Sequence, residues 1–313
     1  MDRDPDSLAT AIAERAIGWR QLQAALTAQA ASVASPAWVI DEAVEKATGS
    51  RVVSAERVTR GEINEVWAVQ SADGQALVVR ICRLRPHFED ERWAIDAARA
   101  AGVPAPEVLL IAPFEIDGQT VEVGVQRRLP GRGLDEVLFG ARPPEAVDVH
   151  TWMRAAGALL AGIHGVSVDG FGHLDSAGHA ADPTWSRFLD FAERGGDQIR
   201  SAAVANGLEV SQFDAAKDVI RRHREVYDGH PPKLVHGDFH PKHLLVHGAT
   251  VSGVVDFEAC RGGDPAYDVA TWDFAYEGVL PTEWLIEGYV EVAPLGDDWE
   301  LRIRLCRVVL GLF

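Results

Sequence analysis

The sequence of 313 residues predicts an α+β protein with a small lobe, built from an antiparallel sheet and one helix, and a larger lobe that is mainly helical. Two observations support this fold class. Short β-branched runs separated by turn residues fill positions 51–128, whereas apolar residues at helical spacing dominate from Leu134 onward. Pro130-Gly131 separates the two patterns, since this pair ends regular structure. We therefore divide the chain into a helical extension at 1–50, a small lobe at 51–129 and a large lobe at 130–313.

The extension is predicted to be one or two amphipathic helices. Residues 7–48 are rich in Ala, Glu and Gln, and apolar residues recur among them at helical spacing. We expect these helices to pack on the domain that follows. The apolar positions are Leu8, Ile12, Ile17, Leu22 and Leu26.

The small lobe is predicted to hold four or five strands and one helix. Turn pairs such as Asp73-Gly74 and Asp117-Gly118 separate its β-branched runs. Helical periodicity over 88–101 ends at Gly102, which is a common helix stop. The predicted strands include 52–53, 66–69, 76–81 and 120–125.

The large lobe is predicted to consist of helices joined by loops. Helical spacing marks 147–164, 185–191 and 213–227, and the glycine-rich stretch 165–182 is predicted to be a loop. His164 ends the first of these helices and is expected to be structural. Asp264-Pro265 predicts a further helix, because Asp caps helix N-termini and Pro suits the first turn.

Acids and imidazoles gather around a predicted hairpin in the large lobe. Apolar runs at 244–246 and 251–255 flank a turn at 247–249. A hairpin brings its ends together, so we expect Asp238 and His243 to face Asp256. Such a group suits a divalent cation held beside a catalytic acid or base.

Two alternatives use the same residues. His236, His240 and His243 lie within eight residues, and the first two have the spacing of zinc ligands on one helix face. Pro241 breaks the helix that this arrangement needs, which argues against zinc. The second alternative is a purely structural loop.

The spacing of these residues resembles a known family. Asp238 and His243 are five residues apart, as are the catalytic Asp and metal-binding Asn of the kinase catalytic loop, and Asp256 stands where kinases carry a magnesium-binding Asp. Together with 262–270, the pattern resembles the aminoglycoside phosphotransferase family of small-molecule kinases. The resemblance implies a bilobal, protein-kinase-like fold. His243 replaces the usual Asn, as in macrolide phosphotransferases.

The resemblance implies transfer of the γ-phosphate of ATP or GTP to a hydroxyl group of a small molecule. Asp238 would accept or orient the hydroxyl proton, and Asp256 and His243 would bind Mg²⁺. Because an imidazole is a poorer magnesium ligand than an amide oxygen, His243 could instead hydrogen-bond phosphate or Asp238. His236 and Asp268 are expected to support the catalytic loop, with Asp268 buried beneath it.

The small lobe would then bind the nucleotide. No lysine occurs between Lys46 and Lys217, so Arg80 would take the place of the phosphate-holding lysine, with Glu91 as its partner. An ordinary surface arginine and glutamate are the alternative. The resemblance also implies a nucleotide-covering loop at 59–65, unless this segment is a simple hairpin turn. It further implies hydrogen bonds from backbone groups near Arg127 and Leu129 to the base.

The acceptor is expected to be an aminoglycoside- or macrolide-like antibiotic. The alternatives are choline, an amino alcohol or a sugar, and a nucleotide-binding scaffold without catalysis. A net charge of −17 disfavours nucleic acid and would attract a cationic acceptor. Region 170–210 is a candidate substrate region, and Asp264, Asp273 and Glu277 are candidate contacts, although a solvated acidic face would explain Asp273 and Glu277 as well.

Composition and segment patterns predict the setting of the protein. Its three cysteines lie far apart without metal-type pairing, which favours a reducing compartment. The first residues lack the basic and then apolar pattern of a signal peptide, and the sequence has no run of about 18 apolar residues. We expect a cytoplasmic protein that binds a small molecule but neither nucleic acid nor membrane, as a monomer or homodimer.

Overall fold

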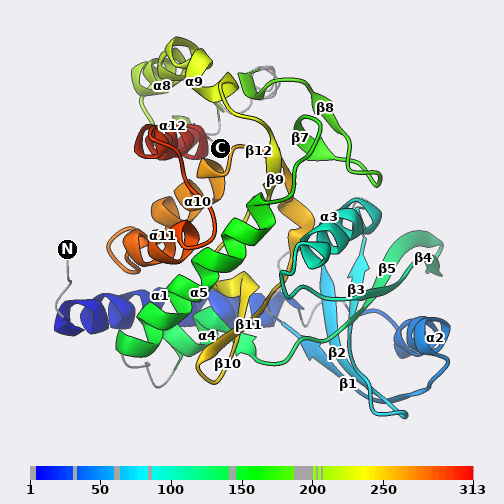
Figure 1. The fold of residues 1–313 in the computed structure, drawn as a ribbon. Helices are drawn as coiled ribbons and strands as arrows, with labels where there is room; N and C mark the ends of the chain where they lie inside the picture. The colour runs from blue at the N-terminus through cyan, green and yellow to red at the C-terminus, as the bar shows by residue number, and fades with distance from the viewer. Residues whose placement is uncertain are drawn as a thin grey trace.

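The computed structural model describes residues 5–30, 34–59, 64–83, 87–140, 146–186, 200–201, 204–205 and 207–312. These residues form a small lobe around one antiparallel sheet and a larger lobe made mostly of helices, as Figure 1 shows. The predicted α+β class is confirmed. Among the described residues, no helix is both long enough and apolar enough to cross a membrane.

The sheet of the small lobe has five strands in the order β1-β2-β3-β5-β4. Asp117 and Gly118 both have positive φ at the tip of the β4–β5 hairpin, as the two-residue turn requires. Strand β4 was not specified from the sequence. It contains Pro113, which an edge strand tolerates because a missing N–H there need not break the ladder. The strands are β1 (Val52–Val58), β2 (Glu65–Ser71), β3 (Ala76–Cys82), β4 (Val108–Ile116) and β5 (Gln119–Arg127).

The extension forms two helices that pack on different lobes. Helix α2 (Ala37–Thr48) lies against the sheet, with Val39, Ile40, Ala43 and Val44 buried. Helix α1 (Pro5–Ala30) instead joins the core of the large lobe, beside α4 (Leu134–Phe139) and α5 (Ala146–His164). The expectation that the whole extension packs on the following domain is therefore wrong for α1.

The buried face of α1 also differs from the predicted stripe. Leu8, Ile12 and Ala16 are buried at i, i+4 spacing, whereas Ile17 and Leu22 are exposed. The Trp19 indole N–H donates to Asp135 of α4 at 2.9 Å. A single hydrogen-bonded face, narrower than the sequence suggested, thus attaches α1 to the large lobe.

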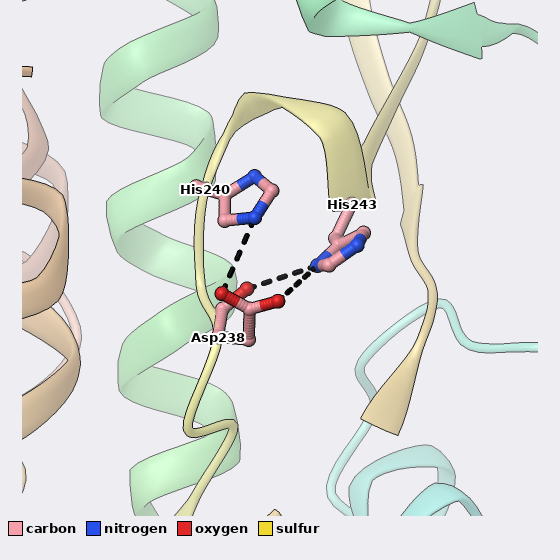
Figure 2. A group of neighbouring side chains, drawn as sticks. All are labelled: Asp238, His240 and His243. Atoms are coloured by element: carbon pink, nitrogen blue, oxygen red, sulfur yellow. Dashed lines mark hydrogen bonds and ion pairs between the residues drawn. The ribbon is translucent and has the colours of Figure 1, made fainter. Parts of the chain in front are cut away.

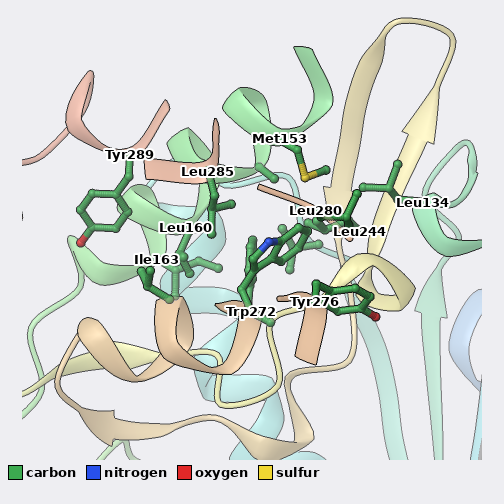
Figure 3. Close-up of a cluster of buried hydrophobic side chains, with 14 of the residues drawn as sticks. Leu134, Met153, Leu160, Ile163, Leu244, Trp272, Tyr276, Leu280, Leu285 and Tyr289 are labelled. Carbon is green, nitrogen blue, oxygen red and sulfur yellow. The ribbon is translucent and has the colours of Figure 1, made fainter. Parts of the chain in front are cut away.

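The core of the large lobe surrounds Trp272, which is fully buried among side chains of the neighbouring helices (Figure 3). Helix α3 (Phe88–Ala100), predicted in full, joins this core through Ala94, Ile95 and Ala98, although its sequence position belongs to the small lobe. The helix that carries Glu91 therefore packs on both lobes, since the backbone N–H of Phe88 also donates to Glu122 of β5. The other helices of this core are α10 (Ala266–Tyr276), α11 (Thr282–Val290) and α12 (Trp299–Leu312).

Two small sheets lie within the large lobe. One has the order β11-β10-β6 and the other β8-β7-β12-β9. The prediction of a loop over 165–182 is wrong, because β7 and β8 pair there as an irregular hairpin. The strands are β6 (Arg132–Gly133), β7 (Phe171–Leu174), β8 (Ala180–Asp182), β9 (Lys233–Val235), β10 (Leu244–His247), β11 (Thr250–Val254) and β12 (Arg261–Gly263).

The remaining helical predictions have mixed outcomes. The predicted helix 213–227 is two helices, α8 (Val210–Arg222) and α9 (Arg224–Asp228), divided at His223. Most of the predicted helix 185–191 lies outside the described residues, as does the centre of the predicted nucleotide-covering loop, 60–63.

Candidate active site

The β10–β11 hairpin brings the predicted acids together through His243. Its strands pair from Leu244 opposite Val254 to the turn, so the loop before β10 and the residues after β11 lie side by side. His243 Nδ1 lies 3.6 Å from Asp238 Oδ2, and His243 Nε2 lies 3.1 Å from Asp256 Oδ2. The predicted convergence is therefore present, and one buried imidazole stands between the two carboxylates.

Hydrogen bonds to the Asp268 carboxylate fix the backbone of the loop that carries Asp238. This fully buried carboxylate accepts hydrogen bonds from the backbone N–H groups of His236 at 2.7 Å and Gly237 at 2.8 Å. His164 Nε2 lies 3.0 Å from the same carboxylate. Gly237 has φ 81, and a Cβ atom there would lie 2.0 Å from the Ala259 carbonyl oxygen, so only glycine fits. The conformation of the loop is thereby determined before any ligand binds.

Asp238 has one carboxylate oxygen paired with His240, a contact that the sequence reasoning did not predict. Its side chain is 46% exposed, and Oδ1 lies 3.2 Å from His240 Nε2. The backbone N–H of Lys242 donates to His240 Nδ1, so Nε2 carries the ring hydrogen. Burial alone would raise the pKa of Asp238, but the hydrogen bond from His240 and the nearby imidazoles outweigh it and lower the pKa to about 2. Asp238 is thus a carboxylate at neutral pH.

His243 is packed between two other imidazoles. Its ring centroid lies 4.3 Å from that of His240 and 5.9 Å from that of His236. Burial makes the charged form of His236 unfavourable and lowers its pKa to about 4, so this ring is neutral. Burial also opposes protonation of His243, but the pKa of His243 is raised because Asp256 and Asp238 flank it. A proton and a divalent cation would therefore compete for His243.

Asp256 occupies a backbone conformation that is rare for residues other than glycine. Its φ of 68° and ψ of 64° lie in the left-handed region. Phe257, which follows, is fully buried, and its N–H donates to Glu91 Oε1 at 3.2 Å. These anchors direct the Asp256 carboxylate toward Arg80 and His243. Although burial opposes its ionisation, those two partners lower the pKa of Asp256 well below its usual value.

Arg80 on β3 is the centre of a buried ion cluster. Its Nη1 donates to both oxygens of Glu91 at 2.5 and 2.7 Å, and Nη2 lies 3.2 Å from Asp256 Oδ1. Nη2 also lies 3.3 Å from Glu258 Oε2, which accepts a hydrogen bond from Asn64 at 2.7 Å. Burial alone would lower the pKa of Arg80, but Glu91 and Asp256 raise it. Glu258, which was not among the predicted site residues, is thus a third acid on Arg80.

A cavity of about 290 Å³ opens beside Arg80 and Asp256, between the lobes. The Arg127 N–H is already bonded to the Glu107 carbonyl, whereas the Leu129 N–H has no hydrogen-bond partner among the described residues. A base in this cavity would therefore meet the backbone at Leu129. The apolar lining comes from Val58, Val66, Val78, Leu129, Leu245 and Val255.

Near Asp238, two sets of nitrogen and oxygen atoms are close enough together to be ligands of one divalent cation. Asp238, His240 and His243 converge, with one ligand atom from each within 4.8 Å of the others (Figure 2). In this set, however, His240 Nε2 carries its hydrogen, and His243 Nδ1 lies 3.0 Å from the Asp238 carbonyl, to which only a donor can bind. The second set, His243 Nε2 and Asp256 Oδ2, presents a lone pair from each atom when the ring is neutral. The donor chemistry therefore fits a cation between His243 and Asp256.

The candidate substrate acids lie in other surroundings. Asp264 is buried, pairs with Arg302 of α12 and accepts from the Ala266 N–H, which leaves no free surface for a substrate. Asp273 and Glu277 both accept hydrogen bonds from Arg307 of the same helix. Arg307 therefore offsets part of the charge of the predicted anionic face, and these acids attach the last helix.

Comparisons with known proteins extend over most of the chain. A profile of the phosphotransferase enzyme family matches residues 54–283. A homoserine kinase of Gluconacetobacter diazotrophicus is 28% identical over 190 residues, which are 58% of this chain and 54% of the relative. The chain thus spans about half the length of that curated relative.

Solved structures share the fold at low sequence identity. Aminoglycoside phosphotransferase APH(4)-Ia is 20% identical with a TM-score of 0.66, over 88% of this chain and 90% of that one. A proposed fructosamine-3-kinase from Thermobifida fusca YX-ER1 is 23% identical with a TM-score of 0.62, over 88% and 92%. Macrolide 2'-phosphotransferase MphH from Brachybacterium faecium is 20% identical with a TM-score of 0.52, over 87% and 88%. The predicted protein-kinase-like fold is confirmed.

Proposed function

Because this chain belongs to the phosphotransferase enzyme family and is a small-molecule kinase, we propose that it transfers the γ-phosphate of ATP to an acceptor hydroxyl held at Asp238. One observation carries the assignment of residues. His243 lies between Asp238 and Asp256, and Asp256 pairs with Arg80 where both line an apolar cavity between the lobes. We assign the cavity to the nucleotide and the exposed side of Asp238 to the acceptor.

Arg80 is assigned to the phosphates. Its guanidinium is permanently charged and nearly buried, and Glu91 fixes it by two short hydrogen bonds. A charge held in place before the reaction stabilises developing negative charge without reorganisation. Glu91 acts through Arg80 and is a positioning residue.

Asp238 is assigned to the acceptor hydroxyl. A carboxylate with a pKa of about 2 is a weak base, so it is unsuited to removing the proton before the phosphoryl group moves. Phosphoryl transfer through a loose transition state needs little early proton removal. Asp238 therefore orients the hydroxyl and accepts its proton as the new bond forms, while the hydrogen bond from His240 holds the carboxylate in place.

Asp256 and His243 are assigned to a divalent cation, for which Mg²⁺ is the usual choice in kinases. When bound, such a cation neutralises charge on the phosphates. Asp268 and His236 are assigned to support of the loop. Leu129 and Arg127, at the junction of the lobes, are assigned to the base, through the Leu129 N–H and the Arg127 carbonyl.

We propose an aminoglycoside- or macrolide-like acceptor as the first candidate, supported by the fold shared with APH(4)-Ia and MphH. The second candidate is an amino alcohol or sugar, favoured by the homoserine kinase relative. A phosphotransfer screen over aminoglycosides, macrolides, homoserine, fructosamine and choline, with ATP and with GTP, decides between them. A nucleotide-binding scaffold without catalysis would bind ATP and phosphorylate none.

Asp238→Asn tests the central assignment. We expect kcat to fall by about 10²–10⁴, the usual contribution of a positioned acid or base, with nucleotide binding unchanged in a thermal-shift assay. Asp41→Asn, an equal change at an exposed site on α2, should leave kcat unchanged and serves as the control. Near-normal transfer by Asp238→Asn would refute the role.

A further inference from the structure

The imidazole of His243 is fixed in one orientation. The side chain is 6% exposed, and its ring stacks on His240 and His236. Nδ1 lies 3.0 Å from the Asp238 carbonyl oxygen, which can only accept a hydrogen bond. The ring hydrogen of the neutral form is therefore on Nδ1, and the lone pair is on Nε2.

The lone pair on Nε2 faces one carboxylate oxygen of Asp256. His243 Nε2 lies 3.1 Å from Asp256 Oδ2, yet this buried nitrogen has no partner with hydrogen-bond geometry among the described residues. Arg80 engages the other oxygen, Oδ1, and leaves Oδ2 to face the imidazole. Adjacent ligands of one octahedral ion with bonds of about 2.1 Å are about 3 Å apart. The observed separation suits two ligands of one cation.

A nitrogen donor changes which cation such a pair prefers. Mg²⁺ is a hard ion that favours oxygen ligands, whereas affinity for nitrogen rises through the first-row transition metals. With an Asn at this position, both protein ligands of the cation would be oxygen atoms. Here one of the two protein ligands is a nitrogen that cannot rotate away.

We propose that His243 shifts the cation preference of this chain from Mg²⁺ toward transition-metal ions, with Mn²⁺ the ion best suited to the mixed set. Mn²⁺ accepts both carboxylate oxygen and imidazole nitrogen, and it also suits the phosphate oxygens of a nucleotide. The inference rests on the proposed function, because it concerns the cation of the proposed nucleotide site. It assigns His243 a role in metal selection beyond that of binding the cation.

Pulsed electron paramagnetic resonance of Mn²⁺ tests the ligand directly. The full chain is loaded with Mn²⁺ and a non-hydrolysable ATP analogue, and ¹⁴N modulation of the Mn²⁺ signal is recorded. We expect this modulation in the wild type and its loss in His243→Asn. Modulation absent from the wild type, or persisting in the variant through a base nitrogen, would overturn the inference.

Competition between Mg²⁺ and Mn²⁺ tests the preference. The ratio of the Mg²⁺ to the Mn²⁺ dissociation constant should be larger in the wild type than in His243→Asn by about tenfold, the lower end of what altered ligand surroundings cost a metal site. Equal ratios would refute the proposal. If His243→Asn does not fold, His243→Gln supplies the oxygen donor in its place.

The outcome is separable from that of the proposed function. Phosphotransfer without ¹⁴N modulation would reject the role of His243 and leave the kinase assignment standing. Modulation with no transfer to any acceptor would reject the kinase assignment and support the metal ligand.

Discussion

Arg80→Gln distinguishes the structural role of the buried guanidinium from its chemical role. Arg80 is 7% exposed and Glu91 is 2% exposed, and two short hydrogen bonds join them. Removing the guanidinium leaves the Glu91 carboxylate buried without its main partner. Breaking a buried ion pair in this way costs about 3–5 kcal/mol, so we expect a loss of that size in the free energy of unfolding.

The double variant Arg80→Gln/Glu91→Gln should recover most of this stability. Two neutral amides need much less hydration than a stranded carboxylate, and replacing a whole buried pair is often nearly neutral. Catalysis should not recover, because neither amide carries the charge assigned to the phosphates. We expect kcat/KM to stay lower by about 10²–10³ in both variants, as when one preorganised donor is removed from an active site.

Urea unfolding followed by tryptophan fluorescence measures the stabilities, and a coupled ADP assay measures kcat/KM. Glu91→Gln alone provides the matched control, since it keeps the guanidinium, with Asp256 and Glu258 still paired to it. A loss below about 1 kcal/mol for Arg80→Gln would show that the pair is not buried in solution. Recovery of activity in the double variant would exclude Arg80 as the phosphate residue.

Two further predictions concern stability. Gly157→Ala should lower the free energy of unfolding by about 3 kcal/mol or more, because its Cβ atom would lie 1.8 Å from the Leu285 carbonyl oxygen of α11 and force α5 and α11 apart. The control is Gly311→Ala, which has open space around it and should be neutral or slightly stabilising in thermal unfolding. Acid should also destabilise the fold through His236. Its pKa is about 4 when folded and about 6.5 when unfolded, so its contribution is complete above pH 6.5 and is lost as the pH falls toward 4, by about 2 kcal/mol at pH 5. His236→Gln should remove this component of the pH dependence measured by urea unfolding, and an unchanged pH profile would contradict it.

Local patterns were sufficient for much of the fold. Runs of β-branched residues and paired turn residues predicted β1, β2, β3 and β5 of the small lobe, and the 3.6-residue period predicted α3 and α5 closely. Strands β7 and β12 were not predicted because they are short and contain glycine. They are stabilised by strand pairing, β7 with β12 and β12 with β9.

The residues of the candidate active site also differ in whether local patterns could predict them. Asp238, His243 and Asp256 are close in sequence to one hairpin, so their convergence follows from local geometry. Arg80 and Glu91 were predicted through the family resemblance, from their positions on a strand and the next helix. Glu258 was not, because its partners Arg80 and Asn64 lie far away along the chain. The pairing of Asp273 with Arg307 had no local signal either.

The sequence by itself therefore determined the hairpin of the site and the types of charged group that this hairpin brings together. Tertiary structure alone decided that α1 packs on the large lobe, that Asp264 pairs with Arg302, and which nitrogen of His243 is free. The physical reason is the distance along the chain over which each interaction acts. Helix and turn preferences act between residues a few positions apart, whereas burial, ion pairing and the hydrogen-bonded state of an imidazole depend on whichever distant surface the folded chain places against them.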